Sequence, residues 1–397
     1  MSRLVPADLD ELRDAVAGAL AAEEAVEIVT SGSKRGLGRP LQTPHVLDLS
    51  RLAGIREYEP NELVLTAGAA TPLAAIDRAL AEAGQMLAFE PPDWRGLLGD
   101  GGEPSLAGVL ACNLAGPRRI KSGAARDHFL GFRAVSGRGE IFKAGGKVVK
   151  NVTGYDLCKL MAGSFGTLAA LEEVTVKVLP APETVATVLI ACADAAAAVR
   201  LMGAALASPH EVSGAAFFAR ATMTGIEAAA VALRVEGHAP SVAFRRDALA
   251  REHGADATLD DARSATLWRM VGAAAPLADL SGRAIWRISA APARGAELAE
   301  TIGALDGEWF LDWGGGLLWA AVPEAGDAGA ATIRAAIRGA DGLGTGHATL
   351  VRGSPGLRRT VAVFEPQPEP LAALSRRVKE AFDPRRILNP GRMAESA

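Results

Sequence analysis

The chain has 397 residues, which is long for one hydrophobic core and predicts two or more domains. Apolar residues make up 49% of it and charged residues 22%, a composition typical of soluble globular proteins and not of disordered ones. The formal net charge of −4 excludes a basic balance of the kind that favours nucleic-acid binding.

The cysteines and the N-terminus exclude further classes. Cys112, Cys158 and Cys192 have neither CxxC spacing nor a paired pattern, which argues against a disulfide scaffold, a zinc site and an iron–sulfur ligand set. Acidic residues between positions 8 and 14 interrupt any signal-peptide core, and no run of about 18 apolar residues could span a membrane. We therefore expect a cytoplasmic protein that reaches the inner membrane, if at all, through a partner.

The first 84 residues alternate helical and extended patterns. Apolar spacing predicts a helix over 6–24, and short β-branched runs predict strands over 26–31, 45–50 and 62–70. Residues 71–84 predict a second helix, capped by Thr71, with Pro72 at its first position and Gly84 at its end. Residues 31–40, between the first two strands, form a loop.

The next hundred residues carry longer loops. Residues 91–119 predict a loop, a short helix and a second loop. Residues 129–146 predict two strands around the turn Ser136–Gly139, and 167–180 predict a strand that ends at Pro180. Four basic residues gather here, either as a solvated patch or as a surface facing phosphate or a partner: Arg118, Arg119, Lys121 and Arg126.

Beyond Pro180 strand-like and helix-like segments alternate up to about residue 365. A hairpin over 309–323, turned by glycines 314–316, and several apolar strands are typical of an α+β domain with an antiparallel sheet. We place the domains at 1–180 (subdomains about 1–60 and 61–180) and 181–370, followed by a C-terminal helix and tail at 371–397.

The loop at 31–38, "SGSKRGLG", is a candidate phosphate site. Its glycines let backbone amides approach an anion, and Lys34 and Arg35 add positive charge. It is neither a P-loop nor a G-x-G-x-x-G fingerprint, and an ordinary connector remains the alternative. A second glycine-rich segment, 99–116, would run beside the same ligand.

Four stretches together resemble a known family: "VTSGSKRGLGRP", the segment 102–156, "LMAGSFGTLAALEEVTVKVLP" and "FDPRRILNPGRM". They are similar to the PCMH-type FAD-binding domain of the vanillyl-alcohol oxidase superfamily and, within it, to FAD-binding subunits of glycolate oxidase (glycolate dehydrogenase). The resemblance implies an α+β fold in which a two-subdomain FAD-binding domain is followed by an α+β cap domain with an antiparallel sheet.

The resemblance also implies the cofactor and its contacts. The first loop would bind the FAD diphosphate, the second segment would contact the flavin, a later strand would lie along the adenine end, and the tail would approach the flavin ring. The cofactor contacts expected on this basis are Ser31, Gly32, Ser33, Lys34, Arg35, Gly36, Gly38, Gly102, Ser105, Gly108, Asn113, Gly116, Glu173, Val174 and Asn389. Because the first loop lacks a histidine, we expect the FAD to be non-covalent.

The segment 147–168 is unusually polar for a connector. One interpretation gives Asn151, Thr153, Gly154 and Tyr155 to the flavin or the substrate. The other is a helix that Thr153 caps and whose apolar residues pack inward. Both remain open, and a helix is expected under either.

Oxidation of a 2-hydroxy acid requires a cation for the carboxylate and a base for the hydroxyl proton. His347 and Arg352, five residues apart, are candidates for base and clamp, with His128 and Tyr155 as further catalytic candidates; ordinary surface or core roles are the alternative. The remaining histidines include no cluster spaced for a metal, so no metal site is expected.

Two classes of function follow. The resemblance implies a FAD-binding subunit that oxidises glycolate, or a small 2-hydroxy acid such as D-lactate, to the 2-oxo acid together with a larger flavin subunit and an iron–sulfur subunit. The alternative is a self-sufficient FAD-dependent 2-hydroxy-acid dehydrogenase. A cofactor-free assembly scaffold is the outlying option.

Overall fold

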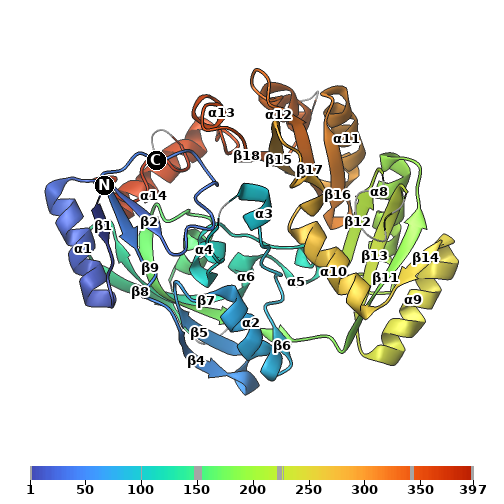
Figure 1. Cartoon of the computed structure of the whole chain (residues 1–397), viewed down its shortest axis with the longest axis horizontal. Helices are drawn as coiled ribbons and strands as arrows, with labels where there is room; N and C mark the ends of the chain where they lie inside the picture. The colour runs from blue at the N-terminus through green and yellow to red at the C-terminus, as the bar shows by residue number, and fades with distance from the viewer. Residues whose placement is uncertain are drawn as a thin grey trace.

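The computed structural model describes residues 2–99, 101–146, 154–220, 226, 228–339 and 344–394. Figure 1 shows two lobes, the N-terminal one with both chain ends and the second built around a large sheet. Strands and helices alternate along the chain, the main strands form separate sheets in the two lobes, and the expected α+β class is confirmed.

The N-terminal lobe contains two main sheets. A parallel one has the order β1-β3-β2, and an antiparallel one has the order β4-β5-β9-β7-β8. The strands are β1 (Ser2–Leu4), β2 (Val26–Val29), β3 (His45–Asp48), β4 (Ile55–Glu59), β5 (Val64–Gly68), β7 (Phe129–Ser136), β8 (Ile141–Gly145) and β9 (Ala169–Lys177), with β6 (Gln85–Met86) and β10 (Leu179–Pro180) as a separate pair.

The first two helices of this lobe begin differently. Asp8 caps α1 (Leu9–Ala22) by accepting a hydrogen bond from the amide of Glu11. The expected cap at Thr71 is wrong, because this buried hydroxyl donates to the carbonyl of Gly68 and Pro72 occupies the cap position of α2 (Leu73–Glu82). The other helices are α3 (Arg95–Leu98), α4 (Leu106–Ala111), α5 (Arg119–Ser122), α6 (Ala125–His128) and α7 (Leu157–Met161).

The second lobe is an eight-stranded antiparallel sheet of order β14-β11-β13-β12-β16-β17-β15-β18. Its strands are β11 (Thr184–Ala191), β12 (Gly214–Phe218), β13 (Ala230–Gly237), β14 (Ala257–Leu259), β15 (Arg283–Ala290), β16 (Glu308–Asp312), β17 (Leu317–Pro323) and β18 (Gly346–Arg352). The hairpin expected over 309–323 is confirmed as β16 and β17. We call this lobe the cap; its expected boundaries at 181 and 370 stay predictions.

The two faces of the cap sheet bury different cores. On β12, Phe217 packs toward the helices, whereas its neighbour Phe218 packs toward the N-terminal lobe, as alternation in a strand requires. The helices on the outer face are α8 (Ala195–Ala207), α9 (Ala239–His253), α11 (Gly295–Ala304) and α12 (Ala330–Arg338). Trp268 of α10 (Asp261–Gly272) lies in the core shared with the N-terminal lobe.

The C-terminal segment returns to the first sheet. After α13 (Leu357–Thr360) and α14 (Glu369–Phe382), Leu388 pairs in parallel with Val26 of β2. The buried Lys379 holds this turn by donating to Asp383 at 2.7 Å and to the carbonyls of Thr167 and Leu388. The tail is thereby fixed beside the loop that follows β2 (Figure 1).

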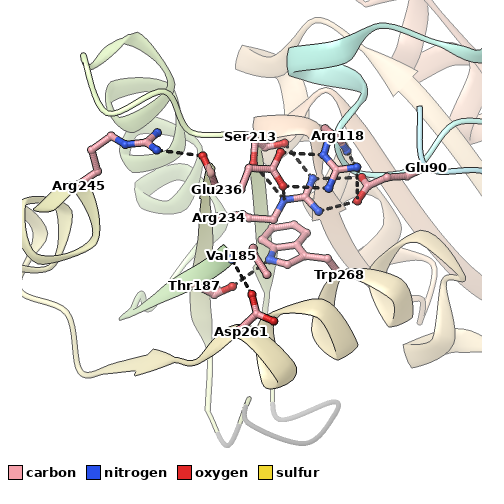
Figure 2. A network of polar contacts seen from close by, with 10 residues as sticks. All are labelled: Glu90, Arg118, Val185, Thr187, Ser213, Arg234, Glu236, Arg245, Asp261 and Trp268. Carbon is pink, nitrogen blue, oxygen red and sulfur yellow. Dashed lines mark hydrogen bonds and ion pairs between the residues drawn. The ribbon is translucent and has the colours of Figure 1, made fainter. Parts of the chain in front are cut away.

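A cluster of two buried arginines and two partly buried glutamates joins the lobes (Figure 2). Arg234 of β13 forks onto Glu90 at 2.7 and 3.1 Å, and Arg118 forks onto Glu236 at 2.7 and 2.9 Å. These two pairs join the lobes, and within the N-terminal lobe Arg118 also lies 3.2 Å from Glu90. Burial raises the pKa of Glu236, but its bond to Arg118 and the nearby Arg234 charge outweigh this and hold the pKa below its usual range.

Candidate flavin site and basic interlobe hollow

The loop after β2 borders a pocket that encloses about 770 Å³, part of it open to solvent. Three other segments complete the walls: α4, the turn at 164–166 and the C-terminal tail. The lining residues are Ile28, Val29, Thr30, Gly32, Ser33, Lys34, Arg35, Leu49, Ala107, Gly108, Ala111, Cys112, Ser164, Phe165, Gly166, Ala169, Leu171, Asn389 and Arg392.

The two glycine-rich segments interlock at one end of this pocket. A Cβ on Gly102 would collide with the carbonyl of Ser31 and lie 3.0 Å from the amide nitrogen of Ser33. The hydroxyls of Thr30 and Ser105 are 2.7 Å apart, and Ser105 caps α4 by accepting from the amide of Gly108. The absence of a side chain at position 102 therefore sets the position of the first loop.

The tail forms the opposite wall. The side-chain oxygen of Asn389 accepts from the amide of Ile28, and its nitrogen donates to the carbonyl of Phe165, both at 2.8 Å. Arg392 is buried and donates to the carbonyls of Arg35 and Leu37 at 3.1 Å. These bonds attach both ends of the first loop to the tail.

The chemistry of this lining fits a dinucleotide that carries a diphosphate. Lys34, Arg35 and Arg392 place cationic side chains along this lining, with the amides of a glycine loop beside them, and Glu27 pairs with the guanidinium groups of Arg35 and Arg392. Ile28, Leu171 and Phe165 supply apolar surface for planar rings. A concave site with a largely apolar lining and a few polar groups is typical of cofactor sites.

Several expected cofactor contacts lie elsewhere. Gly102 borders a second hollow on the other side of the first loop, which Ser31, Gly32 and Arg35 also line. Among the residues that the structure describes, those expected contacts that do not line the 770 Å³ pocket are Ser31, Gly36, Gly38, Gly102, Ser105, Asn113, Gly116, Gly154, Glu173 and Val174. Asn151 and Thr153 fall outside the described residues.

Two of these residues have other surroundings. Glu173 of β9 reaches Arg133 of β7 at 3.3 Å, and the strand presents Ala169 and Leu171 to the pocket instead. Gly38 adopts a φ of +76°, and a Cβ there would lie 2.7 Å from the Arg392 side chain. Gly38 thus leaves the space that the Arg392 side chain occupies behind the pocket wall.

The four expected catalytic residues do not converge. Arg352 donates to the backbone carbonyls of Leu277, Ala278, Leu280 and Leu97. His128 is buried against Phe89 and donates from Nε2 to the carbonyl of Ser122, at 2.8 Å.

The other two catalytic candidates are exposed. Tyr155 is 91% exposed, just before α7, whose N-cap is Asp156. The five-residue α7 is the helix that the polar segment predicted. His347 lies at the start of β18 and lines a hollow at the junction of the lobes.

This basic interlobe hollow spans about 920 Å³, part of it open to solvent. Its lining residues are Asn113, Ala115, Arg119, Ala124, Arg126, Asp127, Arg287 and His347. Arg287 comes from β15 and was not predicted, whereas Arg119 belongs to the basic group noted in the sequence. Asn113 is thus placed here and not in the larger pocket.

Burial and nearby charges shift the pKa of three groups in and beneath the hollow. Burial and the nearby Arg119 lower the pKa of Arg287 to about 10, so it remains cationic at neutral pH. Although the His347 side chain is exposed to solvent, partial desolvation at the junction of the lobes and the positive charges of Arg287 and Arg119 lower its pKa, which favours the neutral imidazole. Beneath them, burial raises the pKa of Asp312 to about 7, although a bond from the amide of Trp313 opposes this.

Asp312 should make stability pH-dependent. Its folded pKa of about 7 exceeds the ordinary 3.8, so the folded state binds the proton more tightly and stability falls as pH rises from about 4 to about 7. Asp312→Asn should remove this slope, up to about 1.4 kcal/mol per pH unit. Urea unfolding of both proteins at pH 5, 6, 7 and 8 checks it; parallel profiles would contradict the buried acid.

Comparison with known proteins assigns the chain to a class. Residues 3–145 match the model of the FAD binding domain, and residues 356–393 match that of the FAD linked oxidase C-terminal domain. The fold is also that of 4-ethylphenol oxidase from Gulosibacter chungangensis (TM-score 0.70, 15% identity, 99% of this chain and 88% of that one) and p-cresol methylhydroxylase (TM-score 0.70, 13% identity, 98% and 88%). The chain is a FAD-linked oxidoreductase of the vanillyl-alcohol oxidase fold.

Within that class the chain belongs to the family of the glycolate oxidase subunit GlcE. It is 36% identical to the Escherichia coli protein over 372 residues, which cover 91% of each chain. A D-lactate dehydrogenase from Archaeoglobus fulgidus is 31% identical over 40% of this chain and 34% of its own. Among the described residues no helix is long and apolar enough to cross a membrane, and no group of three or more potential metal ligands gathers.

Proposed function

We propose that this chain is the FAD-binding subunit of a complex that oxidises glycolate, or a similar small 2-hydroxy acid such as D-lactate, to the 2-oxo acid. The observation that carries the proposal is the 36% identity to a glycolate oxidase subunit over 91% of both chains. The D-lactate dehydrogenase match supports the wider substrate class.

FAD would lie in the 770 Å³ pocket, with its diphosphate at the loop 31–38 and its rings against the apolar wall. When bound, FAD supplies the hydride acceptor. The protein's part is to bind and orient the FAD and to exclude water from its rings. Because the loop carries no histidine, we propose non-covalent binding.

The partners would be a larger flavin subunit and an iron–sulfur subunit, since this chain shows no cysteine set for a cluster. The name of its relative, a subunit, supports assembly into a complex. We place the complex in the cytoplasm, with any contact to the inner membrane made through the partners.

Anaerobic addition of glycolate to the FAD-loaded chain tests the division of labour. We expect little bleaching of the flavin band with the chain alone and full bleaching after the partner subunits are added. Full bleaching of the isolated chain would instead establish the self-sufficient dehydrogenase. A chain that stays oxidised with its partners present would contradict the proposed substrate class.

A further inference from the structure

The basic interlobe hollow brings two arginines from different lobes onto one aromatic ring. The guanidinium carbon of Arg119 lies 4.4 Å from the ring centre of Trp313, and that of Arg287 lies 4.8 Å from it. The indole nitrogen of Trp313 donates to the carbonyl of Gly116, 3.1 Å away in the N-terminal lobe. The ring is therefore fixed, and it holds both arginines in place.

The positive charge of this pair is only partly balanced, by the carboxylates of Asp127 near Arg119 and of Asp312 near Arg287. Among the residues that the structure describes, neither guanidinium has a hydrogen bond or a salt bridge to a protein acceptor. The carboxylate of Asp127, on the same wall, accepts from the amide of Ala124 at 2.9 Å. Asp312 is buried and accepts from the amide of Trp313.

The sheet register adds His347 to the same face. Ser289 of β15 lies opposite His347 of β18, and Arg287 precedes Ser289 by two residues. Because alternate residues of a strand share a face, Arg287 and His347 project from the same side of the cap sheet. A cation and a neutral imidazole thus line one wall, and Arg119 faces them from the other lobe.

We propose that this hollow binds the carboxylate of a small 2-hydroxy or 2-oxo acid, with Arg119 and Arg287 as its clamp and His347 beside the neighbouring oxygen. The proposal rests on the proposed function for its substrate class. It makes this chain a substrate- or product-binding subunit and not a flavin carrier alone. It also assigns the clamp to Arg119 and Arg287 in place of Arg352.

Calorimetric titration of the FAD-loaded full chain with glycolate tests the site, with glycolamide as the uncharged analogue. We expect glycolate to bind more tightly than glycolamide by at least about 10-fold, because a charge-assisted bond to arginine is lost in the amide. The double variant R119Q/R287Q should weaken glycolate binding by roughly 100-fold or more. Arg263→Gln, an exposed arginine on α10, is the matched control and should change nothing.

A second variant keeps the test decisive if the double variant folds poorly. Arg287→Lys retains the charge but loses the planar fork, and it should weaken glycolate binding by roughly 10-fold. Equal glycolate affinity in wild type, Arg287→Lys and R119Q/R287Q, or equal affinity for glycolate and glycolamide, would overturn the site. Neither result depends on flavin reduction, so a chain that binds glycolate but is never reduced would fail the proposed function and leave this site standing.

Discussion

Replacement of Gly102 by valine is expected to weaken FAD binding by roughly 10- to 100-fold, the range that an overpacked contact of about 1–3 kcal/mol produces. A Cβ at this position would occupy the space of the Ser31 carbonyl, so the first loop would have to move. The effect acts on the loop that faces the pocket and not through a special φ at Gly102. Quenching of FAD fluorescence on addition to the apoprotein gives the affinity.

The neighbouring glycine supplies the control. A Cβ on Gly101 would meet no atom within 4 Å, so Gly101→Ala should bind FAD like the wild type, whereas Gly102→Ala should already be impaired. Thermal unfolding of the wild-type, Gly101→Ala and Gly102→Ala apoproteins distinguishes a loss of overall stability from a local displacement of the first loop. Equal FAD affinities for the two alanine variants would show that the loop position does not matter for the cofactor.

Arg234→Gln is expected to destabilise the protein by about 3 kcal/mol, the low end for a broken buried ion pair, because it removes one of the two cations that balance the partly buried carboxylates of Glu90 and Glu236. Arg234 is 2% exposed, forks onto Glu90 across the lobe boundary and stacks on Trp268 at 4.8 Å. Its loss leaves Arg118 to balance both Glu90 and Glu236 (Figure 2). Urea unfolding at neutral pH measures the change, and we expect the cap to separate or unfold at lower urea.

A surface pair from the same lobe provides the comparison. Arg220 and Glu308 are 3.6 Å apart, with the arginine 64% exposed, and Arg220→Gln should cost less than about 1 kcal/mol. The loss of stability in Arg234→Lys should lie between those of the two glutamine variants. Lysine keeps the positive charge but cannot form the paired guanidinium bonds to Glu90. If Arg234→Gln costs no more than Arg220→Gln, the cluster does not hold the lobes together.

Local signals in the sequence predicted the first loop and the short helix that line the proposed flavin pocket, and the resemblance to a known family added the tail. The glycine loop after a strand, the short helix within 91–119 and the "ILNPG" tail are each recognised from a few neighbouring residues. The structure brings loop, helix and tail to one pocket. What the sequence could not supply was the scaffold behind it: Arg392 on the carbonyls of Arg35 and Leu37 is a contact between residues more than 350 positions apart.

The basic hollow was harder to find for the same reason. Arg119 was visible only as one of four basic residues, and nothing near Arg287 or Trp313 in the chain marks a site. The pairing arises because the cap sheet packs onto the N-terminal lobe and places Trp313 against Gly116. Spacing in the sequence does not determine where a side chain points: Arg352 lies five residues from His347, and its guanidinium donates to the carbonyls of Leu277, Ala278 and Leu280.

Hydrogen–deuterium exchange of the chain with and without FAD tests the central claim most directly. If FAD lies between the first loop, α4 and the tail, the amides of 30–38, 106–112, 164–166 and 387–392 should all gain protection when FAD binds, and the outer helices of the cap should not. FAD binding that leaves these four segments unchanged, or protects the cap helices in their place, would contradict the account.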